Sequence, residues 1–168
     1  SVYSSLYWPF GADGSTNSYR LGWKSSMETG GCGYQWGAGT HTYQSCLAND
    51  YYAEDYNRDC PNSGGTADNG AEVRAPIDGQ VIFAGSSTGY GNRVDIKYVT
   101  PSGDVIVFRI AHLQNLPPVT VNQWVRGGVT KIGNVGSTGN STGPHAHVVL
   151  YRINASNCYD ALILKFDA

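Results

Sequence analysis

The sequence carries little charge and no long apolar run. Only 14% of its 168 residues are Asp, Glu, Lys or Arg, and the formal net charge is −2. No cluster of Lys and Arg is available to neutralise phosphates, which argues against a nucleic-acid partner. The longest apolar stretches, such as residues 105–110, have the length of a strand and are too short to span a membrane. We therefore expect neither nucleic acid nor a membrane span.

Cysteine is also scarce, and the four cysteines form no C-x2-C pair of the kind that binds structural zinc. They fit two disulfides in an oxidising compartment instead. Three pairings are possible, and we favour Cys32 with Cys46 and Cys60 with Cys158. Because the sequence starts at Ser1 without an initiator Met or a signal peptide, we expect a secreted, processed form.

Glycine and tyrosine are abundant, with 22 and 12 residues, which is typical of a turn-rich, mostly β domain. No internal repeat or linker indicates a second domain, so we expect a single domain over residues 1–168. Residues 1–70 have no helical periodicity and are expected to be mostly loop. Residues 71–168 are expected to form an antiparallel β-sheet.

Several strands are predicted in the second part of the chain. Residues 72–85 are expected to pair as a hairpin around Asp78-Gly79, and residues 92–113 as a hairpin around a turn at 101–104. Short strands are expected within 121–136. A further strand is expected to begin at His145, after a Gly-Pro break, and to end at residue 153.

Two of the four histidines, His145 and His147, stand one residue apart at the start of this last strand. Alternate side chains of a strand lie on one face, so both imidazoles are able to converge on one site, and Tyr151 would share their face. A half-exposed histidine pair that binds no metal is the alternative interpretation.

The other two histidines lie in different surroundings. His112 ends the second predicted hairpin, and His41 lies in a glycine-rich loop followed by Asp50, Glu54 and Asp55. A catalytic zinc takes three protein ligands, commonly imidazoles with a carboxylate, and keeps one open position. Two histidines and one carboxylate would complete such a site and leave two histidines for proton transfer.

Four motifs now indicate a family. They are A-P-x-D-G-x-V at 75–81, G-Y-G-N at 89–92, A-H-L at 111–113, and G-x-V-G-S-T-G-x-S-T-G-P-H-x-H at 133–147. Together they resemble the lysostaphin-type, LytM-like zinc endopeptidases of family M23 over about residues 70 to 153. The resemblance implies a mostly β, LytM/lysostaphin-like peptidase fold in one domain.

The resemblance also implies the site residues. One zinc ion per chain would be bound by His41, Asp55 and His147. The remaining histidines, His112 and His145, would act as catalytic residues that transfer protons and stabilise an oxyanion.

The first half of the ligand set departs from the family's usual H-x3-D spacing. Tyr51 stands four residues before Asp55, and His41 is the only histidine upstream. This longer spacing resembles the β-lytic and staphylolysin branch. We favour Asp55 because Asp-Tyr-Asn resembles the family's Asp-aromatic-small segment, with Asp50 and Glu54 as open alternatives.

The implied function is that of a secreted, monomeric zinc endopeptidase that hydrolyses Gly- or Ala-containing peptide bonds in bacterial cell-wall peptidoglycan. The alternative is a non-catalytic LytM-like cell-wall-binding or regulatory domain, although degenerate members lack ligands and this chain keeps the full set. A third interpretation, in which the histidines only pack within a disulfide-stabilised module, leaves the long glycine-rich motif unexplained. The aromatic residues that could line a substrate groove are Trp8, Trp36, Tyr43, Tyr51, Tyr52, Tyr90 and Trp124.

Overall fold

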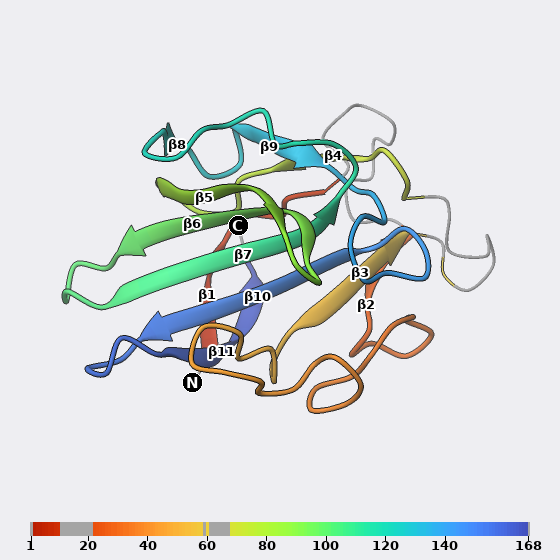
Figure 1. Ribbon diagram of the computed structural model, residues 1–168, viewed down its shortest axis with the longest axis horizontal. Coiled ribbons are helices and arrows are strands. Elements are labelled where there is room, and N and C mark those ends of the chain that lie inside the picture. The colour runs from red at the N-terminus through yellow and green to blue at the C-terminus, as the bar shows by residue number, and fades with distance from the viewer. Residues whose placement is uncertain (1, 11–21, 59, 61–67, 168) are drawn as a thin grey trace.

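The computed structural model describes residues 2–10, 22–58, 60 and 68–167, and within these ranges the protein consists of strands and loops without an α-helix (Figure 1). Accordingly, nothing in the described ranges forms a helix able to cross a membrane. The strands are β1 (Val2–Leu6), β2 (Trp23–Ser25), β3 (Glu54–Arg58), β4 (Glu72–Arg74), β5 (Gly79–Ser87), β6 (Gly91–Val99), β7 (Val105–Leu113), β8 (Trp124–Val125), β9 (Lys131–Asn134), β10 (Ala146–Ile153) and β11 (Tyr159–Phe166).

Nine of these strands form one sheet. Its main order is β1-β11-β10-β7-β6-β5-β8, while β3 pairs with β10 and β2 pairs with β3. Strands β4 and β9 form a separate two-stranded sheet. The pairings are antiparallel apart from β1 with β11, which is parallel. The predicted mostly β fold on an antiparallel sheet is therefore confirmed.

Strand β10 is the centre of this arrangement because three strands pair with it. Strand β7 runs along one edge. The other edge is divided, with β3 opposite residues 146–148 and β11 opposite residues 150–153. In Figure 1, β3 lies beside the start of β10, and β2 flanks β3. The start of β10, which contains His147 and directly follows His145, is thus enclosed between β3 and β7.

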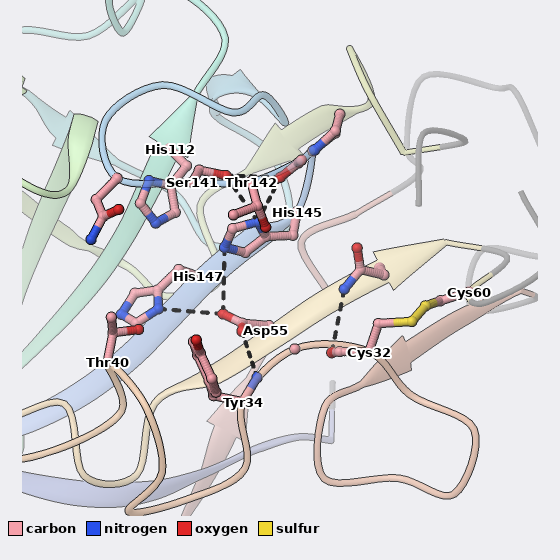
Figure 2. Close-up of a pocket in the computed structure, with 15 residues that line it drawn as sticks. Cys32, Tyr34, Thr40, Asp55, Cys60, His112, Ser141, Thr142, His145 and His147 are labelled. Atoms are coloured by element: carbon pink, nitrogen blue, oxygen red, sulfur yellow. Dashed lines mark hydrogen bonds and ion pairs between the residues drawn. A yellow bond between two sulfur atoms is a disulfide. The ribbon is translucent and has the colours of Figure 1, made fainter. Parts of the chain in front are cut away.

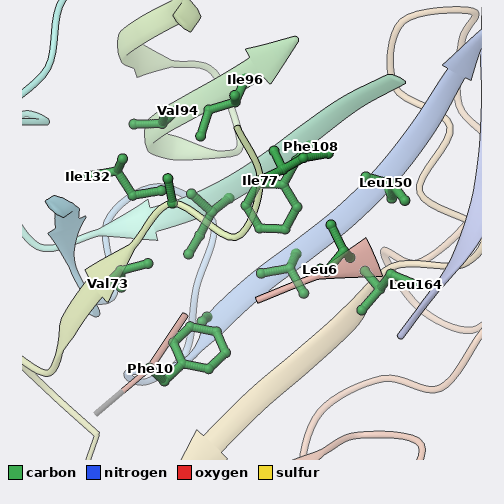
Figure 3. Close-up of a cluster of buried hydrophobic side chains, with 14 of the residues drawn as sticks. Leu6, Phe10, Val73, Ile77, Val94, Ile96, Phe108, Ile132, Leu150 and Leu164 are labelled. Atoms are coloured by element: carbon green, nitrogen blue, oxygen red, sulfur yellow. The ribbon is translucent and has the colours of Figure 1, made fainter. Parts of the chain in front are cut away.

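Both faces of β10 are buried, and its side chains alternate between them. Val148 and Leu150 point into the main hydrophobic core (Figure 3). Val149 and Tyr151 point to the opposite face, where they form a second buried cluster with Ala53 from the segment before β3. Burying each large apolar side chain contributes roughly 1.5–3 kcal/mol, so the two clusters fix the position of the strand from both sides.

The second predicted hairpin is confirmed as β6 and β7, and β10 begins one residue after the predicted start. The first predicted hairpin is wrong, because β4 pairs with β9 and β5 pairs with β6 and β8. Asp78 accepts a hydrogen bond from the backbone N–H of Gly127 instead of closing a turn. At Gly79 a Cβ atom would overlap the Lys97 carbonyl oxygen, so this glycine serves close strand approach.

The N-terminal part contains more regular structure than predicted, since β1, β2 and β3 all lie in it. Strand β3 is almost completely buried. The polar sequence of β3 gave no sign of this burial, because its side chains are buried among polar partners as well as apolar ones.

The favoured disulfide pairing is wrong. Cys32 is bonded to Cys60 and Cys46 to Cys158, with Cα atoms 6.1 and 4.5 Å apart. The chain after β2 lies along β3, where the side-chain amide of Asn57 donates to the Cys32 carbonyl at 3.4 Å, so Cys32 reaches the end of β3. The loop that carries Cys46 lies against the start of β11.

Candidate metal centre and active site

The strand register places the first two predicted ligands opposite each other. Asp55 of β3 is the direct partner of His147 of β10 in the antiparallel ladder. Direct partners share one face of a sheet, and here Asp55 Oδ1 lies 3.3 Å from His147 Nδ1. Both residues are buried, with 4% and 3% of their surface exposed.

The third predicted ligand, His41, comes from the loop between β2 and β3 and is completely buried. Its Nε2 atom lies 3.1 Å from Asp55 Oδ1, and its ring centroid is 4.9 Å from that of His147. One donor atom from each of the three residues lies within 4.8 Å of the others. The structure therefore brings the predicted ligands together despite the long loop between His41 and Asp55.

These residues fit a zinc ion. Donor atoms bound at about 2.0–2.1 Å in a tetrahedron lie about 3.3 Å from one another, and the two separations from Asp55 Oδ1 to the imidazoles of His41 and His147 are 3.1 and 3.3 Å. Two imidazoles and one carboxylate are also donors that zinc prefers.

The second oxygen of Asp55 is held by the backbone. The Tyr34 N–H donates to Asp55 Oδ2 at 3.1 Å, which leaves Oδ1 facing the imidazoles. Gly33 makes this approach possible because its φ is +97° and because a Cβ atom at this position would overlap the Asp55 carboxylate. The segment 33–34 therefore sets the orientation of the carboxylate.

The ligand set favours positive charge. Burial disfavours a charged imidazole, but the Asp50 and Asp55 carboxylates outweigh it and raise the pKa of His147 to about 9. Burial also opposes ionisation of Asp55, yet its contacts with His147 and His41 hold the pKa of that carboxyl well below its ordinary value of 3.8. A metal cation would replace the proton that these carboxylates attract.

The other two predicted residues, His112 and His145, lie next to the ligand set. Their ring centroids are 4.8 Å apart, and His145 Nε2 lies 3.6 Å from Asp55 Oδ1. Each ring has its Nδ1 atom against a backbone carbonyl, that of Thr138 at 2.6 Å and that of Gly143 at 2.8 Å. A carbonyl only accepts, so in the neutral form of each ring Nδ1 carries the proton and Nε2 is left as the acceptor.

A distortion of β7 is what turns His112 toward the site. Ala111 pairs with His147, so in a regular strand the next side chain would point to the opposite face. The pairing of β6 with β7 shifts register at this point, and His112 has a left-handed φ of +59°. Such bulges re-aim side chains next to active sites. Burial and the neighbouring His145 and His147 lower the pKa of His112 to about 4, so the ring is neutral at pH 7.

Four of the five residues, Asp55, His112, His145 and His147, border a cleft of about 560 Å³ (Figure 2). Residues 32–34 and the Cys32–Cys60 disulfide line it on one side, and residues 140–145 of the loop before β10 line it on the other. His41 lies beneath Tyr34, whose ring packs edge-on against it at 5.8 Å between centroids. The cleft is open to solvent, and His112 and His145 line it, so a substrate would meet these two histidines.

The structure separates the alternative acidic ligands from Asp55. Glu54 points to the other side of β3, where its carboxylate accepts hydrogen bonds from Ser25 and Tyr56 at 2.5 and 3.2 Å. Asp50 lies behind His147, with its Oδ2 atom 3.3 Å from Nε2, on the far side of the ring from Asp55. Neither belongs to the cluster of ligand atoms that the described residues form.

None of the seven aromatic residues that were expected to border a substrate groove lines this cleft. Trp8 is buried in the core, and Trp124 is exposed on β8. Tyr90 lines a small hollow beside His147. Tyr34 lines the cleft instead, and no motif singled it out beforehand. The one feature of the sequence that could have indicated Tyr34 is its position two residues after Cys32.

A buried His-Asp-His set in an open cleft, with two further histidines beside it, is typical of a mononuclear metal hydrolase. The comparison with known families is more specific. Residues 65–158 match the model of Peptidase family M23, and the chain belongs to this family. The matched segment contains His112, His145 and His147, whereas His41 and Asp55 lie outside it.

The fold resembles solved M23 structures. The catalytic domain of the antimicrobial peptidase lysostaphin from Staphylococcus simulans is 26% identical, with a TM-score of 0.54 over 83% of this chain and 88% of that domain. A zinc containing peptidase from Vibrio cholerae is 25% identical, with a TM-score of 0.50 over 77% of this chain and 35% of that one. The predicted lysostaphin-like fold is confirmed.

Among curated proteins, the DD-carboxypeptidase/endopeptidase Mpg of Neisseria meningitidis serogroup B is 46% identical over 81 residues. The aligned region covers 48% of this chain and 17% of that relative. The similarity is therefore to one part of a much longer protein.

Proposed function

We propose that this chain is a zinc endopeptidase that hydrolyses peptide bonds of bacterial cell-wall peptidoglycan. The observation that carries the proposal is a buried His-Asp-His set, two members of which line an open cleft, together with two hydrogen-bonded histidines that line the same cleft. Membership of family M23 and the peptidase names of the similar proteins support it.

In this proposal, His41, Asp55 and His147 hold the zinc ion, which when bound acidifies water and polarises the substrate carbonyl. In its neutral form, each of His112 and His145 carries its proton on the Nδ1 atom that faces a backbone carbonyl and presents an unprotonated Nε2 beside the cleft. Either ring is placed to accept a proton from the attacking water and to return it to the leaving amine. Once protonated, the same nitrogen donates to the developing oxyanion.

The shape of the cleft supports a substrate with small side chains. Gly33 contributes to one wall, and Asn140, Ser141, Thr142 and Gly143 contribute to the other, so backbone and short side chains form much of the surface. Gly- or Ala-containing bonds of peptidoglycan stems or cross-bridges match such walls. We also propose that the protein is secreted, since its two disulfides require an oxidising compartment to persist.

The zinc content of the purified protein tests the ligand set. After dialysis without chelator, we expect about one zinc per chain in the parent and almost none in His41→Ala, because three protein ligands hold the ion. Full zinc in His41→Ala would mean that another residue completes the site. Lack of zinc in the parent, even after zinc is added back, would contradict the proposal.

Digestion of purified peptidoglycan separates the enzyme from the alternative, a non-catalytic cell-wall-binding domain. The parent should release soluble peptide fragments whose new amino termini identify the cleaved bond. His147→Ala should release none, and Glu54→Gln, which alters a carboxylate on the other side of β3, should match the parent. Binding to peptidoglycan without release by the zinc-loaded parent would favour the binding domain.

A further inference from the structure

Asp50 is a buried carboxylate that the proposed chemistry does not use. Only 5% of its surface is exposed. Its Oδ2 atom lies 3.3 Å from His147 Nε2 and accepts the Tyr90 hydroxyl at 2.8 Å, and its Oδ1 atom accepts the Tyr151 hydroxyl at 2.8 Å. The carboxylate is therefore held by two donors while it faces the outer nitrogen of a predicted ligand.

One of the two hydroxyl groups that hold Asp50, that of Tyr151, is itself anchored to the sheet. Arg109 of β7 donates to the Tyr151 hydroxyl at 3.2 Å and to the Leu47 carbonyl at 3.0 Å. The same guanidinium forms two hydrogen bonds of 3.0 Å with the carboxylate of Asp95 on β6. This network ties the loop that carries Asp50 to β6, β7 and β10, so the carboxylate has a fixed position relative to His147.

The outer nitrogen of His147 needs such a partner. Nδ1 faces Asp55, so an imidazole that binds metal through Nδ1 carries its proton on Nε2. Nε2 is buried and has no hydrogen bond in ideal geometry to any described residue, and Asp50 is the acceptor that lies within ion-pair distance. A buried N–H without an acceptor would disfavour this protonation state.

We propose that Asp50 is a positioning residue for the metal centre: it accepts the Nε2–H of His147, keeps Nδ1 free for the metal, and makes the imidazole a stronger ligand. The proposal rests on the proposed metal-binding role of His147. Carboxylates in this place behind a ligating histidine commonly change metal affinity by about 10- to 100-fold.

The test is the zinc dissociation constant of the full chain, measured with zinc alone by competition with a chromophoric chelator. We expect Asp50→Asn to bind zinc about 10- to 100-fold more weakly. Asp50→Glu, which restores the charge, should recover part of the loss. Glu54→Gln removes another buried carboxylate of the same segment and should bind zinc like the parent. A folded Asp50→Asn with parental zinc affinity would overturn the proposal.

A second measurement needs no variant and therefore does not depend on how Asp50→Asn folds. Long-range proton–nitrogen NMR spectra of the zinc-loaded parent should show His147 protonated at Nε2 and ligated through Nδ1. Ligation through Nε2 would overturn the role of Asp50. A parent that takes up no zinc would instead refute the proposed function, so the two failures are distinguishable.

Discussion

Gly33 offers a sharp test of how the proposed metal centre is built, because it lies against Asp55 without being one of the proposed ligands. An alanine there would have to adopt a left-handed φ of +97°, and its Cβ would overlap the Asp55 carboxylate. The φ strain costs about 1–2 kcal/mol. Displacing the segment also removes the Tyr34 N–H from Asp55 Oδ2, and a hydrogen bond to a charged group contributes about 1.5–3 kcal/mol.

Gly103 is the matched control. Its φ is +90°, and nothing lies within 4 Å of an added Cβ, so Gly103→Ala carries the backbone strain without the contact. Both variants should lose similar stability from φ, but only Gly33→Ala should bind zinc more weakly. At 1.4 kcal/mol per factor of ten, the lost hydrogen bond corresponds to about 10- to 100-fold in the zinc dissociation constant.

Chelator competition and thermal melting of both variants provide the measurement. If Gly33→Ala and Gly103→Ala bound zinc within twofold of each other, the orientation of Asp55 would not depend on the segment 33–34, and our account of the carboxylate would be refuted.

Three further outcomes follow from other parts of the structure. His112→Ala should keep its zinc in metal analysis and lose about 10²- to 10⁴-fold in kcat on a peptide substrate. Loss of the metal in this variant would contradict the placement of His112 outside the proposed ligand set. Replacing Cys46 and Cys158 by serine opens a 112-residue loop and should lower the free energy of unfolding, measured in urea melts, by about 5 kcal/mol. An unchanged urea midpoint would contradict a stabilising role for this disulfide. Burial raises the pKa of Asp68 to about 7, so the protonated carboxyl contributes stability that is complete below its ordinary pKa of 3.8, declines as the pH rises, and is lost above pH 7. Asp68→Asn should therefore raise Tm by several degrees at pH 8 and by less at pH 5. An equal effect at both pH values would be inconsistent with this titration.

The second half of the chain was predictable because its signals are local. The β6–β7 hairpin follows from alternation and a four-residue turn, and the H-x-H pattern predicts the start of β10 to within one residue, with His145 just before the strand and His147 in it. The Asp78-Gly79 pair also has the local sequence of a hairpin turn, but it does not form one. Asp78 contacts Gly127 instead, and the strands on either side pair with other strands.

Other features depend on pairings that no local pattern encodes. The parallel pair of β1 and β11 joins the two ends of the chain. His112 has the wrong parity to share a face with His147, and only the register shift between β6 and β7 reveals why it reaches the site. Tyr151 does lie on the predicted face, but it reaches His147 through Asp50, a connection that sequence spacing could not indicate.

The divided edge of β10 explains why the site needs both halves of the chain. Because β11 covers only residues 150–153, the first half of that edge is free to pair with β3, and this pairing sets Asp55 opposite His147. The segment that matches the family contains one of the proposed ligands and both histidines proposed for proton transfer, while β3 and the loop before it contain the other two proposed ligands. The Cys46–Cys158 disulfide attaches the loop before β3 to the start of β11, and the Cys32–Cys60 disulfide attaches the same loop to the end of β3. The loop before β3 thus forms one wall of the cleft and, with β3, carries two of the three proposed ligands. Its glycine at position 33 lets the backbone approach the buried Asp55 carboxylate, which a larger residue would displace.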